Sequence, residues 1–298
     1  HAMDSWLKAA LDYIPKWLEY QMRLTEQPGC VIAVAHKGRV LLDEAFGLSD
    51  IATGEVLTPR HRFRVASHSK SFTAAAVFKL RENGLVRLDD PAGRYVDGLH
   101  PAVAELTLTQ LLSHSAGLIR DGADAGQWQD RRPFLGEKEL RAALTEPPII
   151  EPSTRLKYSN HGFGLVGLVI EAVTGEHYGD WVKREIVDAA KLGETDPDAP
   201  PAHGAALASG HSRKLPLGRR RIVPGDNRTH ALAPATGFVS TASDLARFFA
   251  SFDPAARHSI LSPASRRDMI RRQWHDIQSN PENAYGLGIM RGKVGDWE

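Results

Sequence analysis

Apolar residues recur three or four positions apart in several stretches of the chain, which is the spacing of one face of a helix. Glycine or a polar turn follows most of these stretches, as a helix end requires. Pro15 lies inside the first of them and is expected to kink or divide that helix. The predicted helices lie within residues 6–22, 67–82, 106–112, 164–173 and 243–252.

Two apolar runs near the N-terminus predict β-strands instead. Residues 30–35 and 40–46 are short, and the four residues between them include Gly38. Short apolar runs joined by a glycine-containing turn are typical of a β-hairpin. Because a hairpin alone is only marginally stable in water, we expect further strands to complete the sheet. Residues 285–290 have the pattern of one such strand.

Composition excludes several kinds of partner. The 298 residues carry 37 basic and 36 acidic side chains, a net charge of +1, so we expect neither nucleic acid nor an anionic membrane as a partner. The basic run at 219–221 is too short for a phosphate-tracking surface and predicts a solvated hairpin or loop. No stretch approaches the ~20 apolar residues that cross a bilayer. No signal peptide is visible, which favours a cytoplasmic location.

Cysteine and histidine give no metal pattern. Cys30 is the single cysteine, so no internal disulfide forms, and a buried thiol is expected there. The thirteen histidines include no His-Glu-x-x-His, and thiolate zinc sites need more cysteines than this chain has. We therefore expect no metal and no cofactor.

A candidate nucleophile stands at Ser67, where a short extended segment meets the helix predicted at 67–82. A serine hydroxyl needs a base to take its proton. Lys70 lies one helical turn further on the same face, and burial would lower its pKa so that a neutral amine is available. The helix N-terminus would also stabilise the oxyanion that forms when a carbonyl is attacked.

Ser-x-x-Lys is a weak pattern by itself. A chain of this length is expected to contain about one such match by chance, and Ser5-Trp6-Leu7-Lys8 in the N-terminal helix is another. An ordinary interpretation stands beside the catalytic one: Ser67 would cap the helix, and Lys70 would be a solvated helix residue.

A second pattern, Tyr-x-Asn, occurs once, at Tyr158 and Asn160. A tyrosine near a lysine can pass a proton to a leaving group, and an asparagine amide can hold substrate and orient the lysine. His161 follows directly and is a candidate substrate-binding residue of the same pocket. The alternative is a plain turn, because Ser-Asn-His-Gly is good turn chemistry.

Residues 63–73, Phe-Arg-Val-Ala-Ser-His-Ser-Lys-Ser-Phe-Thr, resemble the nucleophile segment of class C β-lactamases, family VIII esterases, D-aminopeptidases and penicillin-binding proteins. Further segments resemble the same group in the same order, so that the resemblance covers residues 28–290. They are Leu-Asp-Asp-Pro at 88–91, Leu-Leu-x-His-x-x-Gly-Leu at 111–118, Tyr-Ser-Asn at 158–160, the helix entry at 237–246 and Tyr-Gly-Leu-Gly at 285–288.

This resemblance implies an α+β fold of the β-lactamase/transpeptidase type, an antiparallel sheet flanked by helices plus an inserted helical domain. Residues 4–75 would hold the N-terminal helix, the hairpin and the nucleophile region. Residues 76–235 would form the mostly helical insertion. Residues 236–298 would return to the first domain, truncated before its last strands.

The resemblance also implies roles for single residues. Ser67 would be the nucleophile, and Lys70 and Tyr158 would share the proton transfers, without a choice between them as the base. Asn160 would contact the substrate and Lys70. His114 would be structural and packed under the site, and the backbone N–H of Ser67 would be one oxyanion donor.

The group has a third motif, Lys/His-x-Gly, on the strand that lines the site. We expect it to follow residues 285–288 and to lie beyond Glu298. The sequence would then be a truncated form, or a separate C-terminal polypeptide would complete the site. Without a second oxyanion donor, the rate would fall by ~10²–10³.

These observations predict a serine hydrolase that cleaves a small ester, amide or peptide through an acyl-enzyme on Ser67. Fold alone does not choose among esterase, D-amino-acid peptidase and β-lactamase. Two other classes stay open: a penicillin-binding covalent sensor that acylates without turnover, and a non-catalytic scaffold. The oligomeric state is not predicted.

Overall fold

The predicted hairpin is confirmed in a computed structural model that describes residues 4–122, 133–275 and 283–295. Lys37 and Gly38 form its turn with φ of 49° and 78°, the positive values that a two-residue hairpin turn requires. A third strand extends the hairpin into an antiparallel sheet in the order β1-β2-β3. The strands are β1 (Gly29–His36), β2 (Arg39–Asp50) and β3 (Glu55–Val56).

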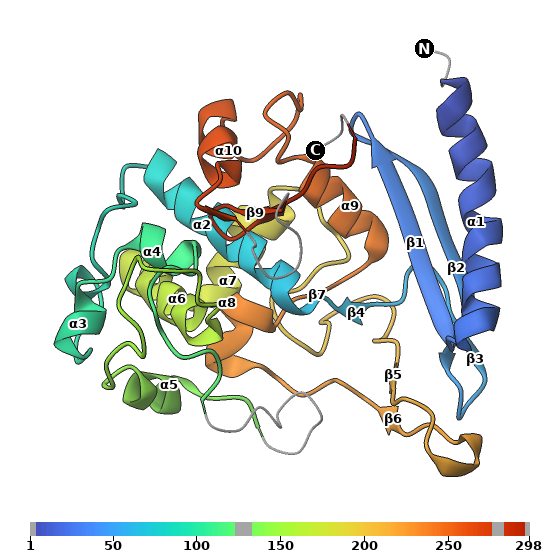
Figure 1. Ribbon diagram of the computed structural model, residues 1–298, viewed down its shortest axis with the longest axis horizontal. Coiled ribbons are helices and arrows are strands. Elements are labelled where there is room, and N and C mark those ends of the chain that lie inside the picture. The colour runs from blue at the N-terminus through green and yellow to red at the C-terminus, as the bar shows by residue number, and fades with distance from the viewer. Residues whose placement is uncertain (1–3, 123–132, 276–282, 296–298) are drawn as a thin grey trace.

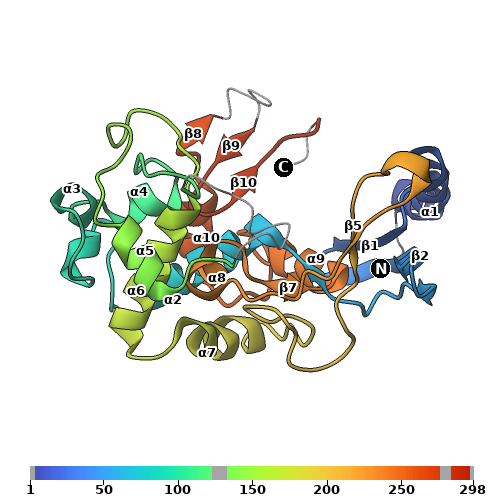
Figure 2. The same cartoon turned by 90° about the horizontal axis from the view of Figure 1, so that it is seen from below.

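Two helices sandwich this sheet. Helix α1 (Ser5–Thr25) covers one face and α9 (Ala242–Ala250) covers the other (Figures 1 and 2). Helix α1 runs through Pro15 as one element, so Pro15 does not divide it; the alternative expectation, a kink at Pro15, stays a prediction. Packing of its apolar face, including the buried Leu7, against the sheet outweighs the backbone hydrogen bond that proline removes.

A second region is built around α2 (Ser69–Glu82), α6 (Asn160–Thr174) and the short α8 (Ala233–Thr236), which contact one another. Helix α2 is buried on nearly every side, which is the position of a central core helix. Close approach of α6 to α8 depends on Gly167, where an added Cβ would lie 2.4 Å from Pro234 Cγ.

Helix α6 begins at Asn160, four residues before the start predicted from its apolar run. The Ser159 hydroxyl caps it by accepting the Gly162 backbone N–H at 2.9 Å. The interpretation of residues 159–162 as a plain turn is therefore wrong, and Asn160 and His161 stand in the first turn of a buried helix.

Shorter elements connect the two regions and cover the core. Strand β9 (Ala284–Tyr285) pairs with β8 (Trp274–His275) and with β10 (Met290–Arg291). The run at 219–221 lies, as predicted, in a hairpin between β5 (Gly210–His211) and β6 (Ile222–Val223). The shorter helices are α3 (Pro101–Ala104), α4 (Leu108–Leu112), α5 (Glu137–Ala143), α7 (Tyr178–Val182) with its π-helical continuation Lys183–Asp188, and α10 (Pro263–Ile270). Strand β4 (Phe63–Arg64) pairs with β7 (Val239–Ser240).

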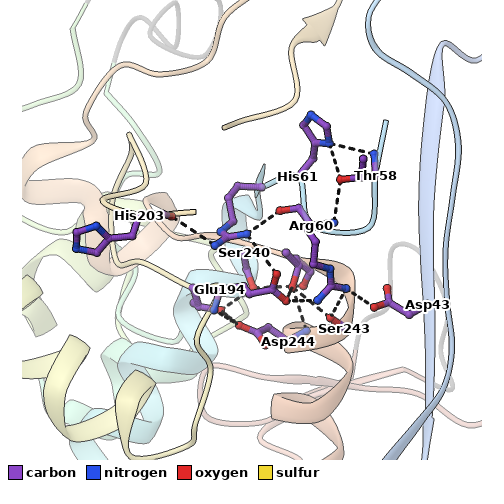
Figure 3. A network of polar contacts seen from close by, with 12 residues as sticks. Asp43, Thr58, Arg60, His61, Glu194, His203, Ser240, Ser243 and Asp244 are labelled. Carbon is purple, nitrogen blue, oxygen red and sulfur yellow. Dashed lines mark hydrogen bonds and ion pairs between the residues drawn. The ribbon is translucent and has the colours of Figure 1, made fainter. Parts of the chain in front are cut away.

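A polar network fastens the sheet to the segment that leads into α2 (Figure 3). Arg60 contacts Asp43 of β2 and also Glu194, whose Oε1 lies 2.5 Å from Arg60 Nη1. Glu194 in turn donates its backbone N–H to Asp244 of α9 at 2.9 Å and approaches the buried Arg62 at 3.4 Å. Elements distant in sequence are thereby held around the chain just before Ser67.

The arrangement confirms the predicted fold class, α+β with an antiparallel sheet flanked by helices and a large helical region. The boundaries proposed at 75/76 and 235/236 stay a prediction. Among the described residues, no helix is long and apolar enough to cross a membrane, and no three His, Cys, Asp or Glu side chains gather as metal ligands would.

Candidate active site

Ser67 lies in a tight turn between β4 and α2. Residues 66–68 form a 3₁₀ helix, and Ala66 has φ of 46°, a left-handed conformation that residues with a side chain seldom adopt. Hydrogen bonds to Phe238 from both sides of the turn fix it: Val65 donates to the Phe238 carbonyl at 3.0 Å, and the Ser69 hydroxyl accepts the Phe238 N–H at 2.9 Å. The exposed Ser67 hydroxyl caps neither this turn nor α2, so the helix-cap interpretation is wrong.

Lys70 is fully buried beneath Ser67, which rules out the solvated-lysine interpretation. Its Nζ lies 3.3 Å from Ser67 Oγ, 2.7 Å from Asn160 Oδ1 and 2.9 Å from the Ala235 carbonyl. Burial lowers the pKa of Lys70 to about 7. A neutral amine has two N–H groups and one lone pair. Once the two N–H groups donate to Asn160 and Ala235, the lone pair is left for the Ser67 hydroxyl.

Tyr158 approaches Ser67 from the segment that precedes α6. Its hydroxyl donates to Ser67 Oγ at 2.5 Å, and the centroid of its ring lies 4.5 Å from Lys70 Nζ. Burial raises the pKa of Tyr158, whereas its hydrogen bond to Ser67 and the nearby Arg120 oppose that rise. The Tyr158 side chain is therefore a neutral phenol at neutral pH. In this form it can donate a proton, whereas only the phenolate could act as a base.

His114 lies under Tyr158, at the place that the family resemblance implies for it. Its ring centroid is 4.2 Å from that of Tyr158 and 4.9 Å from that of Tyr285. Its Nδ1 accepts the backbone N–H of Ser159 at 3.1 Å, which fixes the chain next to Tyr158. Burial holds the pKa of His114 well below its usual range, so the ring is neutral.

Four of the five predicted site residues thus come together: Ser67, Lys70, Tyr158 and Asn160. His161 is buried beside Asn160, and its backbone N–H donates to the Arg120 carbonyl at 3.2 Å. Within the described residues no hydrogen bond joins the His161 side chain to the other four. Its role as a substrate contact stays a prediction.

Three contacts of the site are not marked in the sequence patterns. The carbonyl of Ala235 is a backbone group, so no side-chain pattern in the sequence indicates its contact with Lys70. Arg120 places its guanidinium carbon 5.1 Å from the Tyr158 ring centroid, and Asp121 binds Asn160. Both follow the block at 111–118 by two and three residues, and that proximity is the one signal that could have indicated them.

Lys293-Val294-Gly295 has the letters of the third motif, which the sequence prediction placed beyond Glu298. The triplet follows β10 after one intervening residue, Gly292, and its order in the chain agrees with the motif. The Lys293 side chain is exposed, Val294 is 80% exposed, and among the described residues no hydrogen bond joins Lys293 to Ser67. The residue types of this triplet and its position in the chain match the third motif, but the triplet does not contact Ser67.

The sheet between two helices and the large helical region define a β-lactamase-like fold, and the serine–lysine–tyrosine cluster lies at the start of α2. The chain belongs to the Beta-lactamase family, which it matches over residues 16–297. Protein flp of Staphylococcus aureus (strain N315) is 25% identical to it over 173 residues, 57% of this chain and 34% of flp. The chain thus spans about a third of the length of this curated relative.

Two solved structures share the fold. The octameric penicillin-binding protein homologue from Pyrococcus abyssi superposes with a TM-score of 0.81 at 23% identity, covering 97% of this chain and 65% of that one. The D-stereospecific amidohydrolase from Streptomyces sp. superposes with a TM-score of 0.72 at 26% identity, covering 91% of this chain and 80% of that one. The chain is therefore similar in sequence and fold to a hydrolase.

Proposed function

We propose that this chain is a serine hydrolase that cleaves an amide or ester bond through an acyl-enzyme on Ser67. One observation supports it most: Ser67 Oγ lies within hydrogen-bonding distance of both a buried lysine, Lys70, and a partly buried tyrosine, Tyr158, at 3.3 Å and 2.5 Å. A hydroxyl in such a position has a base for its proton and an acid for the leaving group. Similarity to a D-stereospecific amidohydrolase agrees with this chemistry.

Lys70, rather than Tyr158, is the base in this proposal. The pKa of Lys70 falls to about 7, so a large fraction of its amine is neutral near neutral pH. The pKa of Tyr158 is raised by burial, so its phenolate is scarce there. A base must hold a free lone pair at the working pH, and of these two groups Lys70 meets that condition.

Acylation then follows from these positions. The Ser67 proton passes to Lys70 Nζ as Ser67 Oγ bonds to the substrate carbonyl carbon, and the carbonyl electron pair becomes an oxyanion near the Ser67 N–H. When the oxyanion collapses, the bond to the leaving nitrogen or oxygen breaks and its electron pair stays on that atom. Tyr158 donates its hydroxyl proton to the leaving atom. The proton held by Lys70 then passes to the Tyr158 oxygen and restores the phenol.

Deacylation runs through the same groups. Lys70 takes a proton from water, the water oxygen bonds to the acyl carbon, and Ser67 Oγ leaves with the electron pair of the ester bond. The proton on Lys70 returns to Ser67. One water is consumed, the acyl group is released as a carboxylic acid, and no cofactor takes part.

The rate is expected to follow the protonation of Lys70. Its pKa is lowered to about 7, so the amine is charged and inactive below that pH and neutral above it. We expect kcat/KM to rise with pH through about 7, measured from pH 5 to 9 on a neutral ester that does not itself titrate. A rise centred at or below pH 5 would instead point to a carboxylate base and contradict the role of Lys70.

The amidohydrolase relative suggests an amide of a D-amino acid as the first substrate class to test. We expect p-nitroanilides of D-amino acids to be cleaved with repeated turnover, and those of the L-enantiomers to be cleaved more slowly. The assay compares both series with a p-nitrophenyl ester and with a penicillin. Ester cleavage with no amide cleavage would restrict the proposal to an esterase, and no steady-state turnover of any of the four would overturn it.

A covalent sensor with the same site is the second candidate, because the P. abyssi neighbour is a penicillin-binding protein homologue. It predicts one burst of product equal to the enzyme concentration with penicillin, and no steady state after it. A scaffold predicts neither burst nor turnover. The same assay therefore separates the three functions.

A further inference from the structure

Asp121 lies next to the proposed catalytic residues but in none of the sequence motifs. The residue is 8% exposed, its Oδ1 accepts from Asn160 Nδ2 at 2.6 Å, and its Oδ2 accepts from Arg120 Nε at 3.1 Å. We propose that Asp121 is a positioning residue, which holds the Asn160 amide with its carbonyl oxygen toward Lys70. This inference rests on the proposed function of Lys70 as the base.

The Asn160 side chain needs such a partner because its two ends have nearly the same shape but opposite hydrogen-bonding character. A carboxylate only accepts, so the amide NH₂ must face Asp121 and the amide oxygen must face Lys70. With the amide reversed, its NH₂ would face Lys70 Nζ and compete with the Ser67 hydroxyl for the amine lone pair. Asn160 is 3% exposed, so water is not available to correct the orientation.

The backbone keeps Asp121 in register with Asn160. The N–H groups of Asn160 and His161 donate to the Arg120 carbonyl at 3.1 Å and 3.2 Å. The Ser159 hydroxyl donates to the Ile119 carbonyl at 2.7 Å. The first turn of α6 therefore binds the loop that carries Asp121, and the two side chains are fixed relative to each other by four separate hydrogen bonds, counting the side-chain contact.

Asp121 also acts on Lys70 through its charge. Burial is the largest influence on the pKa of Lys70 and lowers it, Asp121 opposes burial by raising it, and Arg120 lowers it. Two further titratable groups near the amine, His114 and Tyr158, are uncharged near neutral pH. Loss of the Asp121 charge therefore lowers the pKa of Lys70 further, so that the neutral amine persists to lower pH.

Two variants separate charge from orientation. Asp121→Asn removes the charge but keeps an oxygen that can accept from Asn160, so the rise of kcat/KM with pH is expected to move to lower pH, with a plateau within about tenfold of wild type. Asp121→Ala removes both, and leaves a buried amide without its partner. Its plateau is expected to fall roughly 10- to 100-fold.

Asp90→Asn is the matched control. Asp90 is 5% exposed and, like Asp121, accepts hydrogen bonds from two side chains, those of Arg94 and Tyr95. It lies outside the site. This variant is expected to lower the thermal stability and to leave the pH dependence of kcat/KM where the wild type has it. A change common to Asp90→Asn and Asp121→Asn would indicate a general structural effect.

The test measures Lys70 directly, by the pH titration of its ¹⁵Nζ resonance in lysine-labelled protein, with Lys70→Met to assign the signal. A lower Lys70 pKa in Asp121→Asn, with the folded signal of both variants retained, supports the inference. An unchanged or higher Lys70 pKa in Asp121→Asn, or an unchanged plateau in Asp121→Ala, overturns it. The titration needs no turnover, so a wild type without hydrolytic activity would count against the proposed function and not against this reading of Asp121.

Discussion

Ser67→Ala is expected to lower kcat by about 10⁵- to 10⁶-fold on any substrate that the wild type turns over. The alanine lacks the oxygen that forms the acyl-enzyme, and in the described part of the chain no second hydroxyl has the same two partners. The bonds of 3.3 Å to Lys70 and 2.5 Å to Tyr158 converge on this one atom. Steady-state assays with purified variant and wild type measure the effect. A fall below tenfold would exclude Ser67 as the nucleophile.

A matched control for this substitution lies in the chain itself. Ser5 begins the other Ser-x-x-Lys sequence and stands at the start of α1, on the far side of the sheet from the helical region (Figure 1). Ser5→Ala is expected to keep wild-type kcat and KM. Together the two variants show whether the spacing alone matters or whether the buried surroundings of Ser67 are required.

Lys70→Met is expected to lower kcat/KM by about 10²- to 10⁴-fold, the range of a general base. Methionine keeps most of the length and the apolar stem but has no lone pair that can accept the Ser67 proton. Because the side chain is fully buried, water has little access to replace the amine. Lys70→Arg is expected to be as inactive, since a guanidinium stays protonated at any working pH.

The measurement is a pH profile of both variants, with Lys8→Met as the control for loss of a lysine. The residual activity of Lys70→Met is expected to lack the rise through about pH 7 that the wild type shows. Retention of that rise in Lys70→Met would show that another group titrates. Activity of Lys70→Arg within tenfold of wild type would likewise exclude the lysine as base.

Local signals made parts of this fold predictable. The hairpin was predicted because Gly38 and two short apolar runs specify it within a few residues, and the structure confirms its pairing. The side-by-side placement of Ser67 and Lys70 follows from a spacing of three on a helix. The roles of Tyr158 and Asn160 follow from a family resemblance. No local pattern predicts that Tyr158, 91 residues away in sequence, will contact Ser67.

Other features depend on contacts that a sequence does not display. Pro15 stays inside α1 because the sheet supports that helix, and α6 starts early because Ser159 caps it. The Ala235 carbonyl reaches Lys70 through the close packing of α8, which no side-chain pattern records. Asp121 is one acidic residue among 36, and only its distance from Asn160 distinguishes it.

Peptide mass spectrometry after reaction with a fluorophosphonate tests the central claim most directly. An activated serine is phosphonylated where an ordinary serine is not, because the reagent needs the same proton removal as the substrate. We predict one adduct, on the peptide that contains Ser67, formed faster at pH 8 than at pH 6 and absent in Ser67→Ala. An adduct on another residue, or wild-type protein that stays unlabelled at both pH values, would contradict the assignment of Ser67 as the nucleophile.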